Sequence, residues 1–187
     1  MAKTESMIRF KARLFRPAGD DKGAPWTFLN LPQEASKKLP SRSMVSVEGT
    51  FNGFSFQATL LPDGDGGHWL KVDPRLSEGT GAMAGDDIEL AVAPVTVEPE
   101  PEVPDDVQEA LEAAGPKAQE TWASITPLAR RDWIFWIVSG KKAETRMKRI
   151  EVAISKLSAG NRRPCCFDRS GMYDKSLSCP IPDSSED

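Results

Sequence analysis

Residues 94–104 read PVTVEPEPEVP, and the character of the chain changes across this segment. Its four prolines disfavour both a helix and the interior of a sheet, so the segment is predicted to be a linker. Before it, apolar residues recur at every second position, which is typical of strands. After it they recur at every third or fourth position, which is typical of helices. The sequence therefore predicts two parts with a boundary near residue 98.

On the N-terminal side, short alternating segments are separated by turn signals. Asn52-Gly53 is the strongest of these signals, because both residue types tolerate the positive φ of a two-residue hairpin turn. Strands are predicted at residues 7–15, 26–31, 45–52, 54–61, 68–72 and 87–93. About six short strands in this order predict a small antiparallel barrel over residues 1–97, with a sandwich as the alternative.

On the C-terminal side, residues 98–104 are assigned to the Pro/Glu-rich linker and residues 105–160 to a small helical bundle domain. Helices are predicted at residues 105–114, 116–122, 127–139 and 143–159. Residues 161–187 show no periodicity and are predicted to be an irregular tail. The predicted fold class is therefore α+β, a small antiparallel barrel followed by a helical bundle.

Two of these helices carry further signals. Thr126 and Pro127 supply an N-cap and a first-turn proline for the third helix. The fourth helix is predicted to bury one apolar stripe. The residues of that stripe are Met147, Ile150, Ile154 and Leu157.

Composition excludes several classes of protein. The 187 residues carry a net charge of −4, and no apolar run approaches the roughly 20 residues of a membrane-spanning helix. The N-terminus lacks the apolar centre of a signal peptide, so we expect a cytoplasmic protein without membrane insertion. Cys165, Cys166 and Cys179 fit neither a closed disulfide framework nor zinc-ligand spacing and are predicted to be free thiols.

Charge is distributed unevenly along the C-terminal half. Residues 98–112 hold seven acids and no base, whereas residues 141–163 hold eight bases and two acids. Lys142, Arg146 and Arg149 recur at helical spacing, and we expect them to bind an acidic protein partner. Two alternatives remain: a solvated helix whose charge is answered by residues 98–112, or a helix that binds nucleic-acid phosphates without base-stacking aromatic residues.

No catalytic centre is recognisable. His68 is the one histidine, with no motif beside it for nucleophilic or acid–base catalysis, so a non-enzymatic protein is favoured over an enzyme. Asp63 and Asp65 lack the rest of a calcium loop and are better explained by a turn. No metal site or cofactor is expected. As an alternative function, Trp26, His68 and Trp69 are predicted to line a barrel pocket for a small ligand.

Several segments resemble known families. The motifs FKARLF, WTFLNLP, VEGTFNGFSF, LLPDGDGGHWLKV and GDDIELAV resemble a bacterial barrel domain of unknown function. The motifs VPDDVQEAL, WASITPLARRDWIFWI, KKAETRMKRIEVAISKLSAG and RRPCCFD are similar to the YdeI/OmpD-associated family, also labelled bacteriocin-protection proteins. The resemblance implies a small barrel followed by helices and a role in envelope stress or bacteriocin protection, without established catalytic residues. We therefore predict an uncharacterised binding or adaptor protein of this type.

Overall fold

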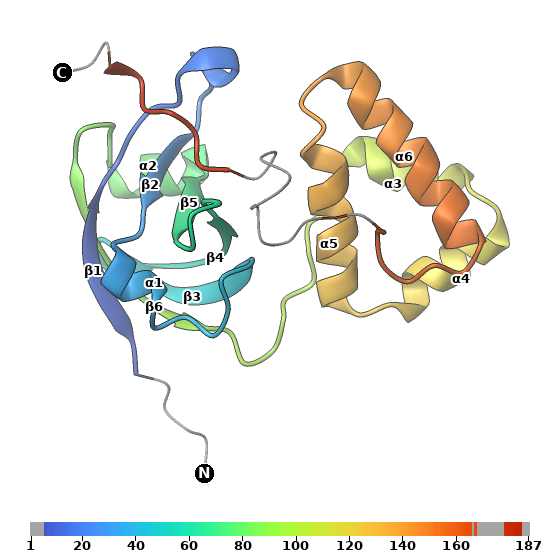
Figure 1. The fold of residues 1–187 in the computed structure, drawn as a ribbon, viewed down its shortest axis with the longest axis horizontal. Helices are drawn as coiled ribbons and strands as arrows, with labels where there is room; N and C mark the ends of the chain where they lie inside the picture. The colour runs from blue at the N-terminus through green and yellow to red at the C-terminus, as the bar shows by residue number, and fades with distance from the viewer. Residues whose placement is uncertain (1–5, 166, 168–177, 185–187) are drawn as a thin grey trace. The chain divides into compact units, whose positions relative to one another are not determined.

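The computed structural model describes residues 6–165, 167 and 178–184, and the chain divides into two compact units. The first unit, called the barrel domain below, comprises Met1–Thr96 together with Asp168–Asp187. The second, the helical domain, is Val97–Phe167. Figure 1 shows strands in the first unit and the longer helices in the second.

The barrel domain is built on six strands among the described residues. They are β1 (Ile8–Arg13), β2 (Thr27–Asn30), β3 (Val45–Phe51), β4 (Phe54–Pro62), β5 (His68–Val72) and β6 (Asp87–Pro94). All neighbours pair antiparallel, in the order β1-β6-β3-β4-β5-β2. The predicted α+β fold with an antiparallel barrel is confirmed.

One pair of residues links the two edge strands of this sheet. Phe15, just after β1, exchanges two backbone hydrogen bonds with Phe28 of β2, at N···O distances of 2.8 and 2.9 Å. This bridge nearly closes the sheet into a barrel, which leaves little unpaired strand edge.

The hairpin between β3 and β4 follows from its turn residues. Asn52 and Gly53 both have positive φ, 48° and 83°, as a two-residue turn of type I′ requires. Phe51 and Phe54 then face each other across the hairpin. The prediction of a hairpin at Asn52-Gly53 is confirmed.

The barrel interior is filled by its own side chains. Alternate residues of the strands contribute large apolar groups that are at most 1% exposed, such as Val47, Phe51, Leu70, Ile88 and Leu90. Burying these groups supplies the main stabilisation of the domain. The interior is therefore a packed core.

Two short helices in the barrel domain were missed from the sequence. They are α1 (Gln33–Ser36) and α2 (Pro74–Thr80), and a 3₁₀ turn, η1 (Gly19–Asp21), accompanies them. The signal for α2 was present, because Asp73 caps the helix through its side chain, which accepts from the Arg75 amide at 2.8 Å, and Pro74 follows.

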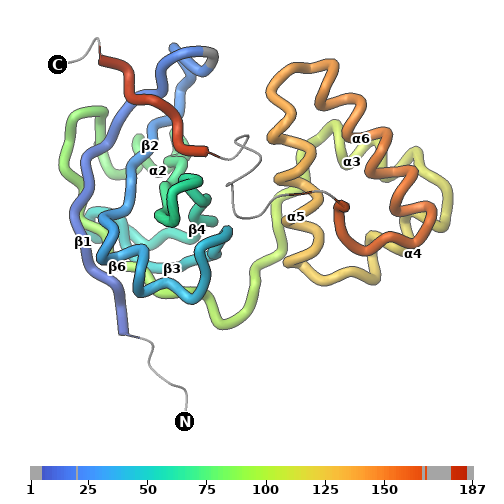
Figure 2. The backbone as a smooth tube through the Cα atoms, viewed as in Figure 1, coloured from blue at the N-terminus to red at the C-terminus, as the bar shows by residue number. Residues whose placement is uncertain are grey.

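The described C-terminal residues 178–184 return to the barrel domain. The Ala18 amide donates to the Ile181 carbonyl at 2.8 Å, and the Asp183 amide donates to the Arg16 carbonyl at 2.9 Å. Figure 2 shows this segment in red beside the blue chain that follows β1. Sequence periodicity did not predict this pairing, because the pairing joins two segments that are more than 150 residues apart in the sequence.

The helical domain contains four helices among its described residues. They are α3 (Asp105–Ala113), α4 (Pro116–Ser124), α5 (Pro127–Val138) and α6 (Ala143–Ser158). Thr126 caps α5 as predicted, since its Oγ1 accepts from the Ala129 amide at 3.2 Å. The core of this domain is centred on Trp133 and Ile137 of α5 and Leu157 of α6, each at most 2% exposed.

One predicted core residue of α6 is wrong. Met147 is 64% exposed, and Ala153, at 3% exposed, lies in the core instead, with Ile150 and Ile154 partly buried beside Leu157. Met147 lies at the edge of the apolar stripe, and the contacts of α6 with α4, α5 and α3 do not extend over that edge. Sequence spacing identifies the buried face of a helix but not its width.

Candidate functional site

The basic side chains of α6 fall into two groups by helical position. At 100° per residue, Arg146 lies on the same side as Ala153 and Leu157, which face the core. Lys142, Arg149 and Lys156 follow one another at intervals of seven residues and lie beside that face. We call Lys142, Arg149 and Lys156 the α6 basic stripe. Glu144 and Glu151 fall on the opposite flank of the helix.

The Arg146 guanidinium is paired with a carboxylate of its own domain. Its Nε and Nη2 donate to the two carboxylate oxygens of Asp106 in α3, at 2.6 and 2.9 Å. These hydrogen bonds from Arg146 lower the pKa of the Asp106 carboxyl below its ordinary value. Asp106 belongs to the acidic residues 98–112. For Arg146 the structure therefore favours the alternative in which this acidic segment neutralises the charge of the basic helix.

Arg149 also has internal contacts. Its Nη1 donates to the Trp136 carbonyl and to Ser139 Oγ, both at 2.6 Å, and its guanidinium lies 5.5 Å from the Trp136 ring centroid. The Trp136 carbonyl is among the last four of α5, which have no partner within their own helix. Arg149 therefore caps α5 while remaining half-exposed at the surface.

The acids of the linker pair with arginines of α5. Arg131 Nη1 donates to Glu98 Oε1 at 2.8 Å, in a pair whose side chains are 8% and 21% exposed. Arg130 Nη2 donates to Glu100 Oε2 at 2.9 Å. This role of Arg130 and Arg131 was not predicted from the sequence, although two adjacent arginines in a mostly apolar helix were a signal that acidic partners were needed.

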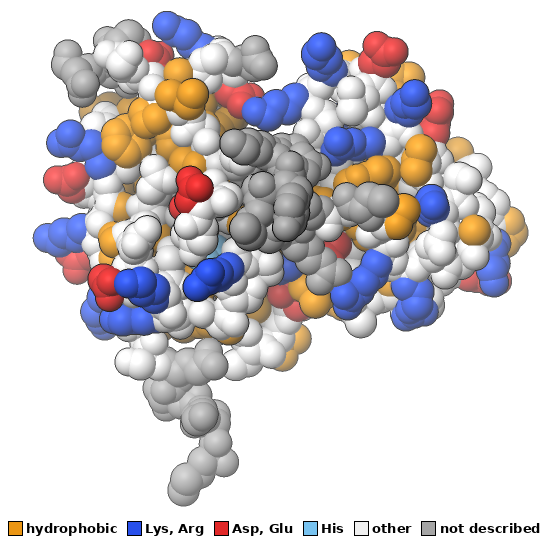
Figure 3. Space-filling view, viewed as in Figure 1, with side chains coloured by type: hydrophobic (Ala, Val, Ile, Leu, Met, Phe, Trp, Pro, Cys, Tyr) orange, Lys and Arg blue, Asp and Glu red, His pale blue; other side chains and the backbone are white. Residues whose placement is uncertain are grey.

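Lys142 and Lys148 are exposed lysines for which the described residues provide no ion pair. Figure 3 shows Lys and Arg side chains spread over the visible surface of the helical domain. Three acids of residues 98–112 are engaged with arginines of the same domain: Glu98 with Arg131, Glu100 with Arg130 and Asp106 with Arg146. The positive charge of Lys142 is therefore not neutralised by an ion pair with any residue that the structure describes.

The structure places the three predicted pocket residues of the barrel in packed surroundings. Trp69 is 5% exposed and packs edge-on against Phe28, with ring centroids 6.1 Å apart. Trp26 is partly buried beside Phe28, and Lys71 Nζ lies 4.5 Å from its ring centroid. Two surface pockets of the barrel domain, one beside α1 and one between β1, β3 and β6, are lined by residues other than Trp26, His68 and Trp69.

His68 is 1% exposed and has a structural contact. Its Nε2 lies 3.0 Å from the Ser43 carbonyl, which only accepts, so Nε2 carries the proton and Nδ1 does not. Nδ1 is buried without a hydrogen-bond partner among the described residues. Burial lowers the pKa of His68 below 6.5, although the Ser43 carbonyl and Asp63 act in the opposite direction.

This burial predicts a pH dependence of stability. Below pH 6.5 the unfolded chain takes up a proton on His68 that the folded chain resists. The free energy of unfolding should therefore be unaffected by His68 above that pH and fall as the pH is lowered from it towards the depressed folded-state pKa. Urea unfolding of the barrel domain in the whole chain, at about pH 7.5 and about pH 5.5, measures this change.

His68→Gln is the matched control, because the glutamine amide keeps a donor for Ser43 and does not titrate. Since His68 is the one histidine in the chain, its replacement should remove the pH dependence in this window. The assignment would be contradicted if the free energy of unfolding changed equally between the two pH values in the original chain and in His68→Gln.

The turn before His68 is held by an aspartate. Asp63 Oδ1 accepts from the amides of Asp65 and Gly67, each at 2.8 Å. These contacts support the interpretation of Asp63 and Asp65 as turn residues. Within the described ranges, no group of three or more His, Cys, Asp or Glu side chains is placed to hold a metal ion.

Cys165 and Cys179 are free thiols, whereas Cys166 lies outside the described residues. Cys179 Sγ donates to Asn30 Oδ1 at 2.9 Å. Burial raises the pKa of the Cys179 thiol to about 11, so this side chain stays protonated at neutral pH. No helix in the described residues combines the length and the apolar character needed to cross a bilayer.

The fold defines a two-part α+β protein, with a small antiparallel barrel preceding a helical domain. Residues 10–92 match the model of a domain of unknown function (DUF1905). Residues 100–160 match the model of the family described as bacteriocin-protection, YdeI or OmpD-associated. The first match spans the strands of the barrel domain and the second spans the helices of the helical domain. No curated protein matches the chain.

Proposed function

We propose that the protein is a non-enzymatic binding protein whose helical domain docks on an acidic surface of a partner protein through the α6 basic stripe. The observation that carries this proposal is the internal pairing of the nearby acids. Glu98, Glu100 and Asp106 are engaged with arginines of the same domain. They are not available to neutralise Lys142.

The residues that carry the proposed interaction differ in part from those expected from spacing alone. Arg146 belongs to the internal contact with Asp106, and Lys156 takes its place beside Lys142 and Arg149. Replacing Arg146 or Arg149 would also remove contacts that hold α6 on the domain. Lys142 is exposed and gives a cleaner test of binding.

The test uses a defined acidic probe, a ten-residue polyglutamate peptide. Titration into the isotope-labelled full chain at low salt is expected to shift the backbone amide signals of α6. Lys142→Glu and Lys156→Glu should each weaken binding about fivefold, because the lost attraction and the new repulsion each contribute about 0.5 kcal/mol, or about 1 kcal/mol together. Binding should decline further when the salt concentration rises to about 0.15 M.

Lys117→Glu is the matched control for Lys142→Glu. Both lysines are exposed and lie at the start of a helix, so the two changes alter net charge and helix dipole alike. Equal weakening by both variants would show only the effect of net charge and contradict the proposal. If the chain bound a nonspecific DNA duplex more tightly than polyglutamate, the proposed partner would be nucleic acid and not an acidic protein.

A further inference from the structure

A pocket opens on the surface of the barrel domain between α1, the chain leading to β3 and the turn before β5. Its volume is about 390 Å³. Protein pockets that hold small organic molecules typically measure about 300–1,000 Å³, so there is space for more than a single ion. Its lining differs from the aromatic residues that the sequence had suggested for a barrel pocket.

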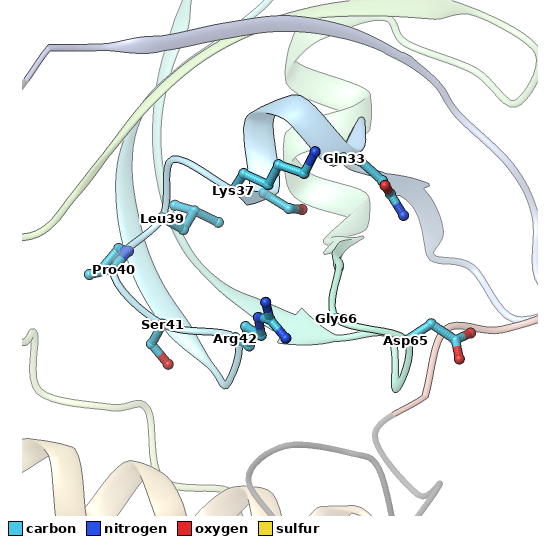
Figure 4. A pocket seen from close by; sticks show the side chains of 9 residues that line it. Gln33, Lys37, Leu39, Pro40, Ser41, Arg42, Asp65 and Gly66 are labelled. Atoms are coloured by element: carbon cyan, nitrogen blue, oxygen red, sulfur yellow. The ribbon is translucent and has the colours of Figure 1, made fainter.

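Two basic side chains line this pocket from separate segments. Lys37 follows α1, and Arg42 lies in the loop before β3 (Figure 4). Arg42 is exposed, and no described residue forms an ion pair or hydrogen bond with its guanidinium. Lys37 pairs with Glu34 at 2.9 Å, in an exposed contact that water weakens. The pocket therefore presents a free guanidinium opposite an ammonium group.

One acid also lies at the pocket. Asp65 belongs to the turn before β5, and Figure 4 shows its carboxylate pointing away from Arg42. The polar groups on the remaining wall include hydrogen-bond donors, the Gln33 amide and the Ser41 hydroxyl. Two cations and these donors favour a negatively charged ligand.

The wall that carries Ser41 and Arg42 is held in place before any ligand arrives. The Ser43 amide donates to Ser41 Oγ at 2.9 Å, and the two serine hydroxyls lie 2.7 Å apart. The Ser43 carbonyl in turn accepts from His68 in β5. A loop tied in this way loses less conformational entropy when it binds a ligand.

Apolar groups complete the lining. Leu39 and Pro40 form one side of the pocket between Lys37 and Ser41 (Figure 4). A ligand that fills the pocket thus needs an organic part as well as an anionic group. We infer that this pocket binds a small organic anion, whose phosphate or carboxylate group is held by Arg42 and Lys37.

The test measures ligand binding to the full chain by changes in backbone amide signals. Inorganic phosphate, glucose 6-phosphate and citrate are titrated separately at constant ionic strength. Saturable shifts are expected at residues 37–42 and at Gly66. Tighter binding of glucose 6-phosphate assigns a phosphate ligand, and tighter binding of citrate assigns a carboxylate ligand, because arginine forms two-pronged contacts with either group.

Arg42→Glu should weaken binding about tenfold or more, since it replaces the free guanidinium with a repelling group. Lys38→Glu is the matched control: it makes the same charge change next to Lys37 but does not line the pocket. The control should retain binding within about twofold. An unchanged amide spectrum outside the pocket shows that both variants are folded.

Two results would overturn the inference. One is the absence of saturable shifts at residues 37–42 with all three anions. The other is an equal loss of affinity in Arg42→Glu and Lys38→Glu, which indicates attraction to the general charge of the surface. Because the pocket and α6 belong to different domains, neither result bears on the proposed docking of an acidic partner.

Discussion

Replacing Gly49 with alanine is expected to destabilise the barrel domain by about 3 kcal/mol or more, at the upper end of the cost of overpacking. Gly49 lies in β3, where it pairs with Phe56 of β4 and Val92 of β6. A methyl group at this position would lie 2.9 Å from Val92 Cα and closer still to the Ala91 carbonyl oxygen. These are backbone atoms, so no side-chain rotation relieves the clash.

The expected loss comes from separating β3 and β6 at the centre of the sheet. Such a shift would disturb the packing of Val47 and Phe51, which are fully buried on β3. The free energy of unfolding, measured with urea and followed by the amide signals of the barrel domain, tests this prediction.

Gly79→Ala is the control for Gly49→Ala. Gly79 lies within α2, its added methyl group would meet no atom within 4 Å, and its φ is not positive. Alanine there should leave stability unchanged or raise it by up to about 1 kcal/mol, because it restricts the unfolded chain. Comparable stability of Gly49→Ala and Gly79→Ala would contradict the close approach of β3 and β6.

Trp133→Ala is expected to destabilise the helical domain by about 3–5 kcal/mol. Trp133 is 1% exposed, packs edge-on against Trp136 at 5.9 Å between centroids, and donates from Nε1 to the Arg162 carbonyl at 3.3 Å. Its removal leaves a large cavity and an unpaired carbonyl. A typical domain has only about 5–15 kcal/mol of stability, so this loss is a large share of the total.

The two domains should respond separately to this change, because each has a hydrophobic core of its own. Amide signals of the helical domain should show unfolding at lower urea concentration, whereas those of the barrel domain should keep their midpoint. Trp136→Ala removes a half-buried ring and should cost less than Trp133→Ala. Equal losses from the two variants would show that Trp133 is not the centre of the core.

Local patterns were sufficient for most of the secondary structure. The alternation of residues 45–61 and the Asn52-Gly53 turn predicted β3, β4 and their hairpin, because side-chain direction and turn conformation depend on adjacent residues. Thr126 and Pro127 marked the start of α5 for the same reason. The extent of a buried face depends on other helices, and Met147 was therefore misplaced.

The candidate sites were harder to predict than the fold. Spacing grouped Arg146 with Lys142 and Arg149, but Arg146 pairs with Asp106, 40 residues away. Likewise, the sequence pattern at residues 33–42 did not predict a pocket, because the walls of the pocket come from segments that only the folded barrel brings together. Trp26 and Trp69 suggested a pocket by residue type alone, and the structure places both rings against Phe28.

The two-part architecture could be recognised from the prolines of residues 94–104 and from the different periods of the segments on either side, because both signals depend only on residues close together in the sequence. The partners of the charged residues required the three-dimensional fold. Arg131 and Glu98 are 33 residues apart in the sequence, and a charge interacts with whatever the fold brings within a few ångströms. Which basic side chains are neutralised inside the domain, and which remain for a ligand, was therefore decided by tertiary contacts.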